Sequence, residues 1–113
     1  MGRGEIFLAQ FPFGDIPGMK LRPVLLLTGP LGPIPEVLVA YISSVIPTQL
    51  LPSDVLLDPA NPEFRSTHLK TISTLRLHKL ATIHFSSLAR YLGLVDTSVQ
   101  TVVTRKLRDL LAA

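Results

Sequence analysis

The apolar residues of this chain gather in short runs separated by proline and glycine, which is the pattern of β-strands joined by turns. Pro23–Thr28 is a continuous apolar run of strand length, and its proline stands first, where a strand can spare the missing N–H donor. Glu36–Ile46 is the longest strand candidate and is rich in Val, Ile and Tyr. Further strands are expected at Glu5–Phe11, Asp54–Leu57, Leu69–Leu77, Thr82–Phe85 and Leu88–Leu94.

Segments rich in Pro, Gly and Asp predict the connections between these strands. Pro12–Arg22 is expected to be a loop, and Gly29–Pro33 is expected to be a turn of a length that suits a hairpin-like return. Pro47–Pro52 interrupts the longest strand candidate, and Asp58–Ser66 is expected to form a loop or a single helical turn.

The last part of the chain has a helical period instead. A helix is expected from about Ser98 to Leu111, with one apolar face made of Val99, Val102, Val103, Leu107, Leu110 and Leu111. Thr97 and Gln100 have the spacing of a capping box at its start. Several short strands followed by one helix predict a mostly β, single domain over residues 1–113, with the helix packed on a small barrel-like sheet.

The composition of the chain suggests that it binds a partner protein. The 113 residues suit one domain, and 47% of them are hydrophobic, which is a high share for so small a chain. Part of the apolar surface is therefore expected at an interface, most simply that of a homodimer. The formal net charge of +3 is compatible with a nucleic-acid ligand but does not require one.

The chain is expected to be a soluble cytoplasmic protein. It has no cysteine, which excludes disulfides, thiol catalysis and cysteine metal sites and suits a reducing compartment. Glycine and proline break the apolar stretch between Pro23 and Pro47, so it does not provide the roughly 18–20 uninterrupted apolar residues of a membrane-spanning helix. The apolar stretch at the N-terminus is too short for a signal peptide.

No metal or cofactor site is expected from the sequence. It contains no pair of histidines at metal-binding spacing and no Gly-rich phosphate loop. His68, His78 and His84 fall in different predicted elements, and each is first interpreted as a structural or solvated histidine.

Three segments carry candidate chemistry. Arg22 lies where the first loop meets a rigid strand, so its guanidinium could grip a phosphate with two hydrogen bonds; the alternative is a pair with a loop carboxylate. Ser43 and Ser44 end a predicted strand, where a hydroxyl could bind a phosphate or satisfy a nearby amide. The segment Ser73–Lys79 brings two cations and an imidazole together, and is otherwise a basic strand edge.

Several segments also occur in a characteristic order along almost the whole chain: Arg3–Leu8, Lys20–Leu26, Ala40–Ser44, Pro52–Val55, Leu69–Arg76, Lys79–Ile83 and Leu92–Gly93. The Lys-x-Arg-Pro-Val element at residues 20–24 is moderately specific alone, and the ordered set of segments is more specific. In this order the chain resembles the MazF/PemK (Kid-like) toxins of type II toxin–antitoxin systems.

The resemblance implies a small SH3-like barrel, a homodimer and a metal-independent endoribonuclease that needs no cofactor. Single-stranded RNA, messenger RNA above all, would be the substrate, and its own 2′-hydroxyl would attack the adjacent phosphate and leave a 2′,3′-cyclic phosphate. A cognate antitoxin would hold the toxin inactive with a tail that folds over the RNA groove.

By the same resemblance, Arg22 would be the phosphate clamp and a candidate proton donor, and Ser43 would donate a hydrogen bond to the phosphate. The expected RNA contacts are Lys20, Ser44, Ser73, Arg76, His78 and Lys79.

The sequence departs from the family pattern where the general base is concerned. Some members carry an acidic residue at the position of Ser73 and a second arginine near Thr71, and this chain has neither. Asp15 is the first candidate for the base, and His78 or Lys79 could serve from the opposite rim. Two alternatives to the nuclease are a binding module that holds RNA or protein without cleavage, and an SH3-like structural domain without a nucleic-acid role.

Overall fold

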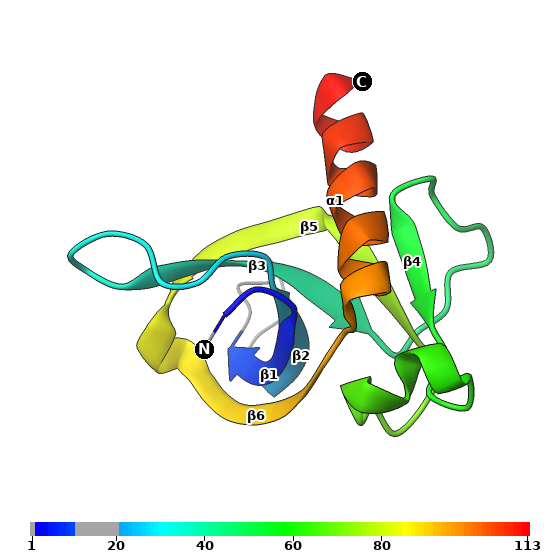
Figure 1. Ribbon diagram of the computed structural model, residues 1–113, viewed down its shortest axis with the longest axis horizontal. Helices are drawn as coiled ribbons and strands as arrows, with labels where there is room; N and C mark the ends of the chain where they lie inside the picture. Colours follow the sequence, from blue (N-terminus) through cyan, green and yellow to red (C-terminus); the bar gives the residue numbers. More distant parts are fainter. Residues whose placement is uncertain (1, 11–20) are drawn as a thin grey trace.

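The computed structural model describes residues 2–10 and 21–113, which form a curled antiparallel sheet with one long helix beside it (Figure 1). Two short 3-10 helices flank the last long strands. In chain order the elements are β1 (Glu5–Gln10), β2 (Leu21–Leu26), β3 (Glu36–Ser43), β4 (Asp54–Leu57), η1 (Pro62–Thr67), β5 (Ser73–His84), η2 (Phe85–Ser87), β6 (Leu88–Leu94) and α1 (Thr97–Ala112). The prediction of a mostly β domain with a C-terminal helix is confirmed.

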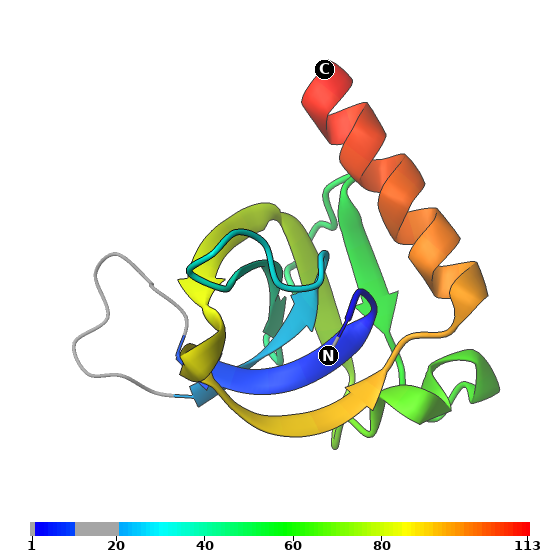
Figure 2. The ribbon, with the colours of Figure 1, turned by 60° about the vertical axis from the view of Figure 1, so that its left-hand side comes forward.

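The strands form one sheet in the order β4-β5-β3-β2-β1-β6, and every neighbouring pair is antiparallel. The sheet curls round like a barrel but does not close, because its edges are β4 and β6 (Figure 2). Its concave side is filled by fully buried aliphatic side chains, among them Ile6, Leu25, Ile42, Leu75 and Leu77. Burial of such side chains from many strands is the main stabilisation of a domain of this size.

β5 is the strand that bends the sheet. It pairs with β3 along both of its halves, but the register jumps between Ala40, opposite Leu80, and Tyr41, opposite Arg76. The extra residues Leu77–Lys79 form a bulge, and bulges increase the local twist and bend of a strand. The sequence predicts two separate strands here, Leu69–Leu77 and Thr82–Phe85; the structure has one bent strand.

α1 covers the core through its first half. Val99 and Val103 are buried against the sheet and Leu107 packs beside them, as the apolar period predicts. The last turns extend past the sheet, so Leu111 is 77% exposed (Figure 2).

The predicted capping box is wrong. The helix begins one residue earlier than expected, and its N-cap is Asp96, whose Oδ1 accepts a hydrogen bond from the Val99 amide at 3.0 Å. Gln100 instead uses its amide to donate to the Val95 carbonyl at 3.1 Å. A carboxylate is a strong acceptor for the free amides of a first turn, which explains why Asp96 holds this position.

Candidate functional site

A cleft of about 410 Å³ opens on the sheet where β2, β3, β6 and the segment before β5 meet. We call it the basic cleft, because its described lining contains three permanent cations and a histidine and no carboxylate. Its lining residues are Leu8, Arg22, Pro23, Tyr41, Ile42, Ser44, His68, Leu69, Lys70, Thr71, Ser73, Arg90, Tyr91 and Leu92. A positive, partly apolar hollow of this kind suits a phosphate joined to a flat ring.

Arg22 lies on one wall of the basic cleft. It is the second residue of β2, opposite Ala9 of β1, and its side chain is half-buried. β2 therefore starts earlier than expected, and Arg22 stands inside a strand rather than in the loop before it. This pairing with β1 fixes the backbone of Arg22, and its side chain lines the cleft.

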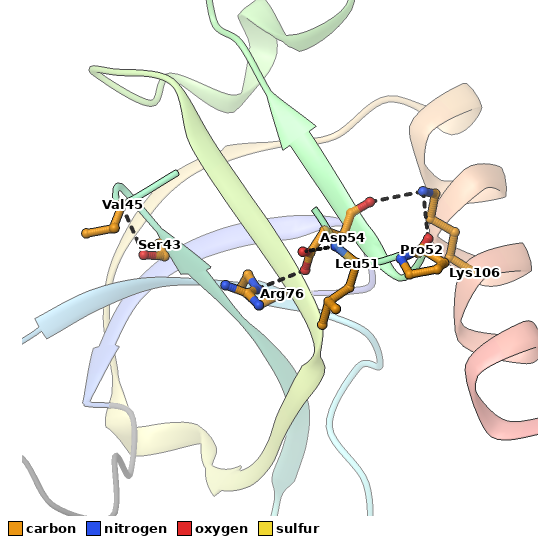
Figure 3. Close-up of polar contacts among 7 residues, drawn as sticks. All are labelled: Ser43, Val45, Leu51, Pro52, Asp54, Arg76 and Lys106. Carbon is orange, nitrogen blue, oxygen red and sulfur yellow. Dashed lines mark hydrogen bonds and ion pairs between the residues drawn. The ribbon is translucent and has the colours of Figure 1, made fainter. Parts of the chain in front are cut away.

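Ser43, the last residue of β3, and Ser44, which follows it, have different surroundings. Ser43 is buried, and its hydroxyl accepts a hydrogen bond from the Val45 amide at 3.1 Å (Figure 3). Ser44 is exposed and lines the basic cleft. The structure thus places the Ser44 side chain on the cleft wall and uses Ser43 to hold the turn that follows the strand.

The segment between η1 and β5 forms the opposite wall. His68 ends η1 in a left-handed conformation, with φ 54° and ψ 25°, and its ring Nδ1 lies 3.0 Å from the Leu92 carbonyl oxygen of β6. Lys70 is exposed beside it, whereas Ser73 is buried and its hydroxyl donates to the Thr71 carbonyl at 3.1 Å. Ser73 therefore contributes to the cleft lining while its own proton is used within the segment.

Aromatic rings complete the basic cleft. Tyr91 on β6 is 46% exposed, and its ring meets that of Phe7 on β1 edge to face, with centroids 5.5 Å apart. Tyr41 on β3 lies below the Lys79 ammonium, which is 5.7 Å from the centre of the tyrosine ring. Lys79 is thereby held next to a lining residue of the cleft.

Arg76 is held by an ion pair away from the basic cleft. Its Nε lies 2.8 Å from Oδ1 of Asp54, the residue directly opposite on β4 (Figure 3). The Asp54 side chain is fully buried, and its other oxygen accepts a hydrogen bond from the Leu51 amide at 2.8 Å. Lys106 of α1 donates to the Asp54 carbonyl at 3.0 Å and so ties the helix to this pair.

His78 also lies outside the basic cleft. It lines a separate hollow between the β4 side and the end of α1, together with Leu51, Lys106 and Leu110. Partial burial is the main cause that lowers the pKa of His78 below its ordinary value, and the nearby Arg76 charge is the next.

The structure brings Arg22, Ser44 and Ser73 into one cleft, with Lys79 at its border. It does not bring Ser43, Arg76 or His78 into this cleft. Asp15 and Lys20 lie outside the described residues.

Much of the site consists of residues that the sequence did not predict. His68 was interpreted as structural, and Lys70, Arg90 and Tyr91 were not chosen at all, although Lys70 stands in one of the family-like segments. Only the pairing of β6 with β1 brings Arg90 and Tyr91 to the same opening as Arg22. No local signal in the sequence reveals that pairing.

Gly93 sets how closely η1 approaches β6 and hence where His68 stands. A Cβ at Gly93 would lie 2.4 Å from the Ser66 carbonyl oxygen and 2.5 Å from that of Thr67. We expect Gly93→Ala to lower the free energy of unfolding by about 1–3 kcal/mol, because backbone must move to admit the methyl group. Urea unfolding measures this change.

Gly2→Ala is the matched control, since the nearest atom to its Cβ is Glu5 Oε1 at 3.9 Å. We expect this variant to keep the stability of the parent chain. Equal stability of the Gly93→Ala and Gly2→Ala proteins would contradict the close packing of η1 on β6.

Comparison with known proteins shows which family this chain belongs to. Residues 2–111 match the family model described as PemK-like, MazF-like toxin of type II toxin–antitoxin system. A search of curated protein sequences gives no significant match. Among solved structures, the toxin MazF-mt6 of Mycobacterium tuberculosis is similar with a TM-score of 0.72 and 23% identity, over 96% of each chain.

Two further structures are similar in fold. An endoribonuclease in complex with its cognate antitoxin, from a mycobacterial species, has a TM-score of 0.67 and 16% identity over 99% of this chain and 95% of its own. MazF of Deinococcus radiodurans has a TM-score of 0.66 and 18% identity over 99% of this chain and 96% of its own.

The described residues contain neither a metal-binding cluster nor a helix that could span a membrane. Residues 2–10 and 21–113 contain no group of three or more His, Cys, Asp or Glu side chains arranged to hold a metal ion. Within the same residues, no helix has the length and apolar character that crossing a membrane requires.

Proposed function

We propose that this chain, which belongs to the PemK-like, MazF-like toxin family of type II toxin–antitoxin systems, is an endoribonuclease that cleaves single-stranded RNA in its basic cleft. One observation carries the proposal: Arg22, Lys70 and Arg90 share one opening with a histidine, a serine hydroxyl and two tyrosines. Cations bind the phosphate backbone, and aromatic faces stack on unpaired bases.

The chemistry we propose uses the RNA's own 2′-hydroxyl as the nucleophile. It attacks the adjacent phosphorus, the bond to the 5′-oxygen breaks, and the product ends in a 2′,3′-cyclic phosphate. Such a reaction needs donors for the crowded phosphate, a base for the 2′ proton and an acid for the leaving oxygen. No metal ion is part of this scheme, and DNA is not a substrate because it lacks the 2′-hydroxyl.

Arg22 would clamp the phosphate that reacts. A guanidinium offers paired donors in a planar fork and keeps its charge at every physiological pH, so it can stabilise the developing negative charge. Ser44 would add a hydroxyl donor from the wall of the cleft, in the role that the family resemblance implies for Ser43. Arg22 cannot accept the 2′ proton, so the reaction needs a separate base. Asp15 and Lys20 stand shortly before Arg22 in the chain as a candidate base and a further RNA-binding cation.

Single-stranded RNA would be held by stacking as well as by charge. The ring of Tyr91 is 46% exposed and contacts Phe7 edge to face, so we propose that a base stacks on it. A base stacked on an aromatic side chain contributes about 1–3 kcal/mol without regard to its identity. Lys70, Lys79 and Arg90 would then bind the neighbouring phosphates. Messenger RNA, which has long unpaired stretches, is the substrate class we propose.

The toxin would act as a homodimer and be neutralised by a cognate antitoxin. Apolar side chains stay exposed beside β4 and after β3, and Val45 is 73% exposed, with Ile46, Leu50 and Leu51 nearby in the chain. An exposed apolar patch of this kind is typical of an interface. One similar solved structure contains its own cognate antitoxin, which supports an antitoxin partner here as well. Light scattering of the purified chain measures the dimer.

The runner-up is a module that binds RNA without cutting it. The absence of an acid at Ser73 favours it, since some family members carry one there. To separate the two, the purified protein is incubated with a long single-stranded RNA in EDTA and the fragment ends are mapped. Fragments with cyclic-phosphate ends support the nuclease. Intact RNA with salt-dependent binding would favour the binding module, and intact RNA without binding would leave only a structural domain.

A further inference from the structure

We infer that His68 is the general base of the basic cleft, and that its Nε2 accepts the proton of the attacking 2′-hydroxyl. The inference rests on the proposed ribonuclease function and assigns a catalytic role that the sequence analysis gave to Asp15, His78 or Lys79. Three observations support the inference: the hydrogen bond of the His68 ring, the backbone conformation of His68, and the chemistry of the other lining residues.

The hydrogen bond fixes which ring nitrogen is free to accept a proton. His68 Nδ1 lies 3.0 Å from the Leu92 carbonyl oxygen. A carbonyl oxygen can only accept, so Nδ1 must carry the hydrogen of this bond. In the neutral ring Nε2 is then the unprotonated nitrogen, on the side of the ring away from Leu92. Catalytic histidines are oriented by a partner on the second nitrogen in the same manner.

The backbone at His68 supports a functional role. With φ at 54°, His68 is the single non-glycine residue among those described that has a positive φ. This conformation is uncommon for residues other than glycine and costs of the order of 1 kcal/mol. The amide of His68 closes η1 by donating to the Arg65 carbonyl at 3.3 Å. The chain thus turns sharply here and places an exposed imidazole at the cleft.

The other polar lining residues are poor bases. Arg22, Lys70 and Arg90 are cations that hold their protons. Serine, threonine and tyrosine hydroxyls also hold theirs near neutral pH. Among the described lining residues, His68 alone has a ring nitrogen that carries a free lone pair in its neutral form. His78 lies in the separate hollow by α1 and cannot serve this cleft.

The proton and bond changes balance without another reactant. The 2′ O–H bond breaks and its proton goes to His68 Nε2, while the 2′-oxygen bonds to phosphorus. The bond from phosphorus to the 5′-oxygen then breaks, and that oxygen takes a proton from a water molecule. The hydroxide that is left takes the proton from His68, and no atom is oxidised or reduced.

Two substitutions remove the imidazole and keep the backbone. Asparagine and glycine both tolerate the left-handed conformation, so His68→Asn and His68→Gly should fold and melt like the parent chain. We expect each to lower the rate of RNA cleavage at neutral pH by about 10²–10⁴-fold, the usual contribution of a general base. Binding of the RNA should stay within about twofold, since the cationic contacts remain.

Two readouts separate a base from a merely structural residue. The parent enzyme should lose kcat/KM as the pH falls and the base becomes protonated, and the His68→Asn variant should lack this acidic limb. Added imidazole should restore part of the activity of His68→Gly and leave His68→Asn unchanged. His84→Asn is the matched control, because His84 caps η2 outside the cleft and asparagine is a good cap.

The outcomes distinguish the inference from the proposed function. If the parent chain cleaves RNA and the two His68 variants cleave it equally well, His68 is not the base, but the proposed ribonuclease function remains valid. Retention of the acidic limb in His68→Asn, with its loss in Asp15→Asn, would assign the base to Asp15. If the parent chain cleaves no RNA, both the inference and the function fail.

Discussion

Replacing Arg22 with alanine is expected to lower RNA cleavage by about 100-fold to 1,000-fold, the cost of removing one main donor to a developing oxyanion. The substitution removes the paired donors that would clamp the reacting phosphate. The half-buried position in β2, opposite Ala9, accepts a small side chain without disturbing the sheet. Initial rates of cleavage and a thermal melt of the same preparation measure the two effects.

Arg22→Lys is the matched control for charge. Lysine keeps the positive charge but not the planar fork, so we expect activity between that of the parent and that of Arg22→Ala. In cells, expression of Arg22→Ala without antitoxin should no longer arrest growth. A folded Arg22→Ala protein that remains as active and as toxic as the parent would remove Arg22 from the mechanism.

Replacing Arg76 with alanine is expected to act on stability instead. Asp54 is fully buried and loses its charged partner in this variant. Breaking a buried ion pair by removing one partner costs about 3–5 kcal/mol, because the remaining charge stays buried without compensation. The Arg76 side chain is 18% exposed, so we expect a value near the lower end, about 3 kcal/mol. Urea unfolding measures this loss.

A double variant separates the ion pair from other effects of Arg76. Arg76→Met with Asp54→Asn removes both charges, and the asparagine oxygen can still accept the Leu51 amide that Asp54 binds now. Replacing both partners of a buried pair is often nearly neutral, so this protein should recover most of the lost stability. It should also cleave RNA at the rate of the parent, since Arg76 lies outside the basic cleft. A stable Arg76→Ala protein with weak RNA binding would restore Arg76 as an RNA contact.

Much of the fold could be predicted because strand and helix periods are local. The strands Asp54–Leu57 and Leu88–Leu94 have the predicted bounds, and the helix extends one residue further at each end than predicted. β5 could not be predicted as one strand, because the bulge at Leu77–Lys79 interrupts the alternation of its side chains. The helix start was missed because Asp96 competes with Thr97 as an N-cap, and the sequence alone did not separate them.

The site was harder to predict, because it depends on pairing between distant strands. Ser43 and Ser44 are neighbours at the end of β3, and only the folded structure shows that Ser43 is buried while Ser44 lines the cleft. Arg76 and Asp54 meet only because β4 pairs with β5. His68 becomes a candidate base only through the Leu92 carbonyl, 24 residues further along the chain. Arg22 lines the cleft, although β2 begins before this residue and not after it as predicted.

The central claim is that the RNA strand is cut by its own 2′-hydroxyl in the basic cleft. The most direct test uses two short RNAs that span a mapped cleavage site and differ by one atom, the 2′-oxygen of the nucleotide that would attack. In EDTA we expect both RNAs to bind equally, the normal RNA to be cut and the 2′-deoxy RNA to stay intact. Cleavage of the 2′-deoxy RNA at the same position would make water the nucleophile and contradict the mechanism.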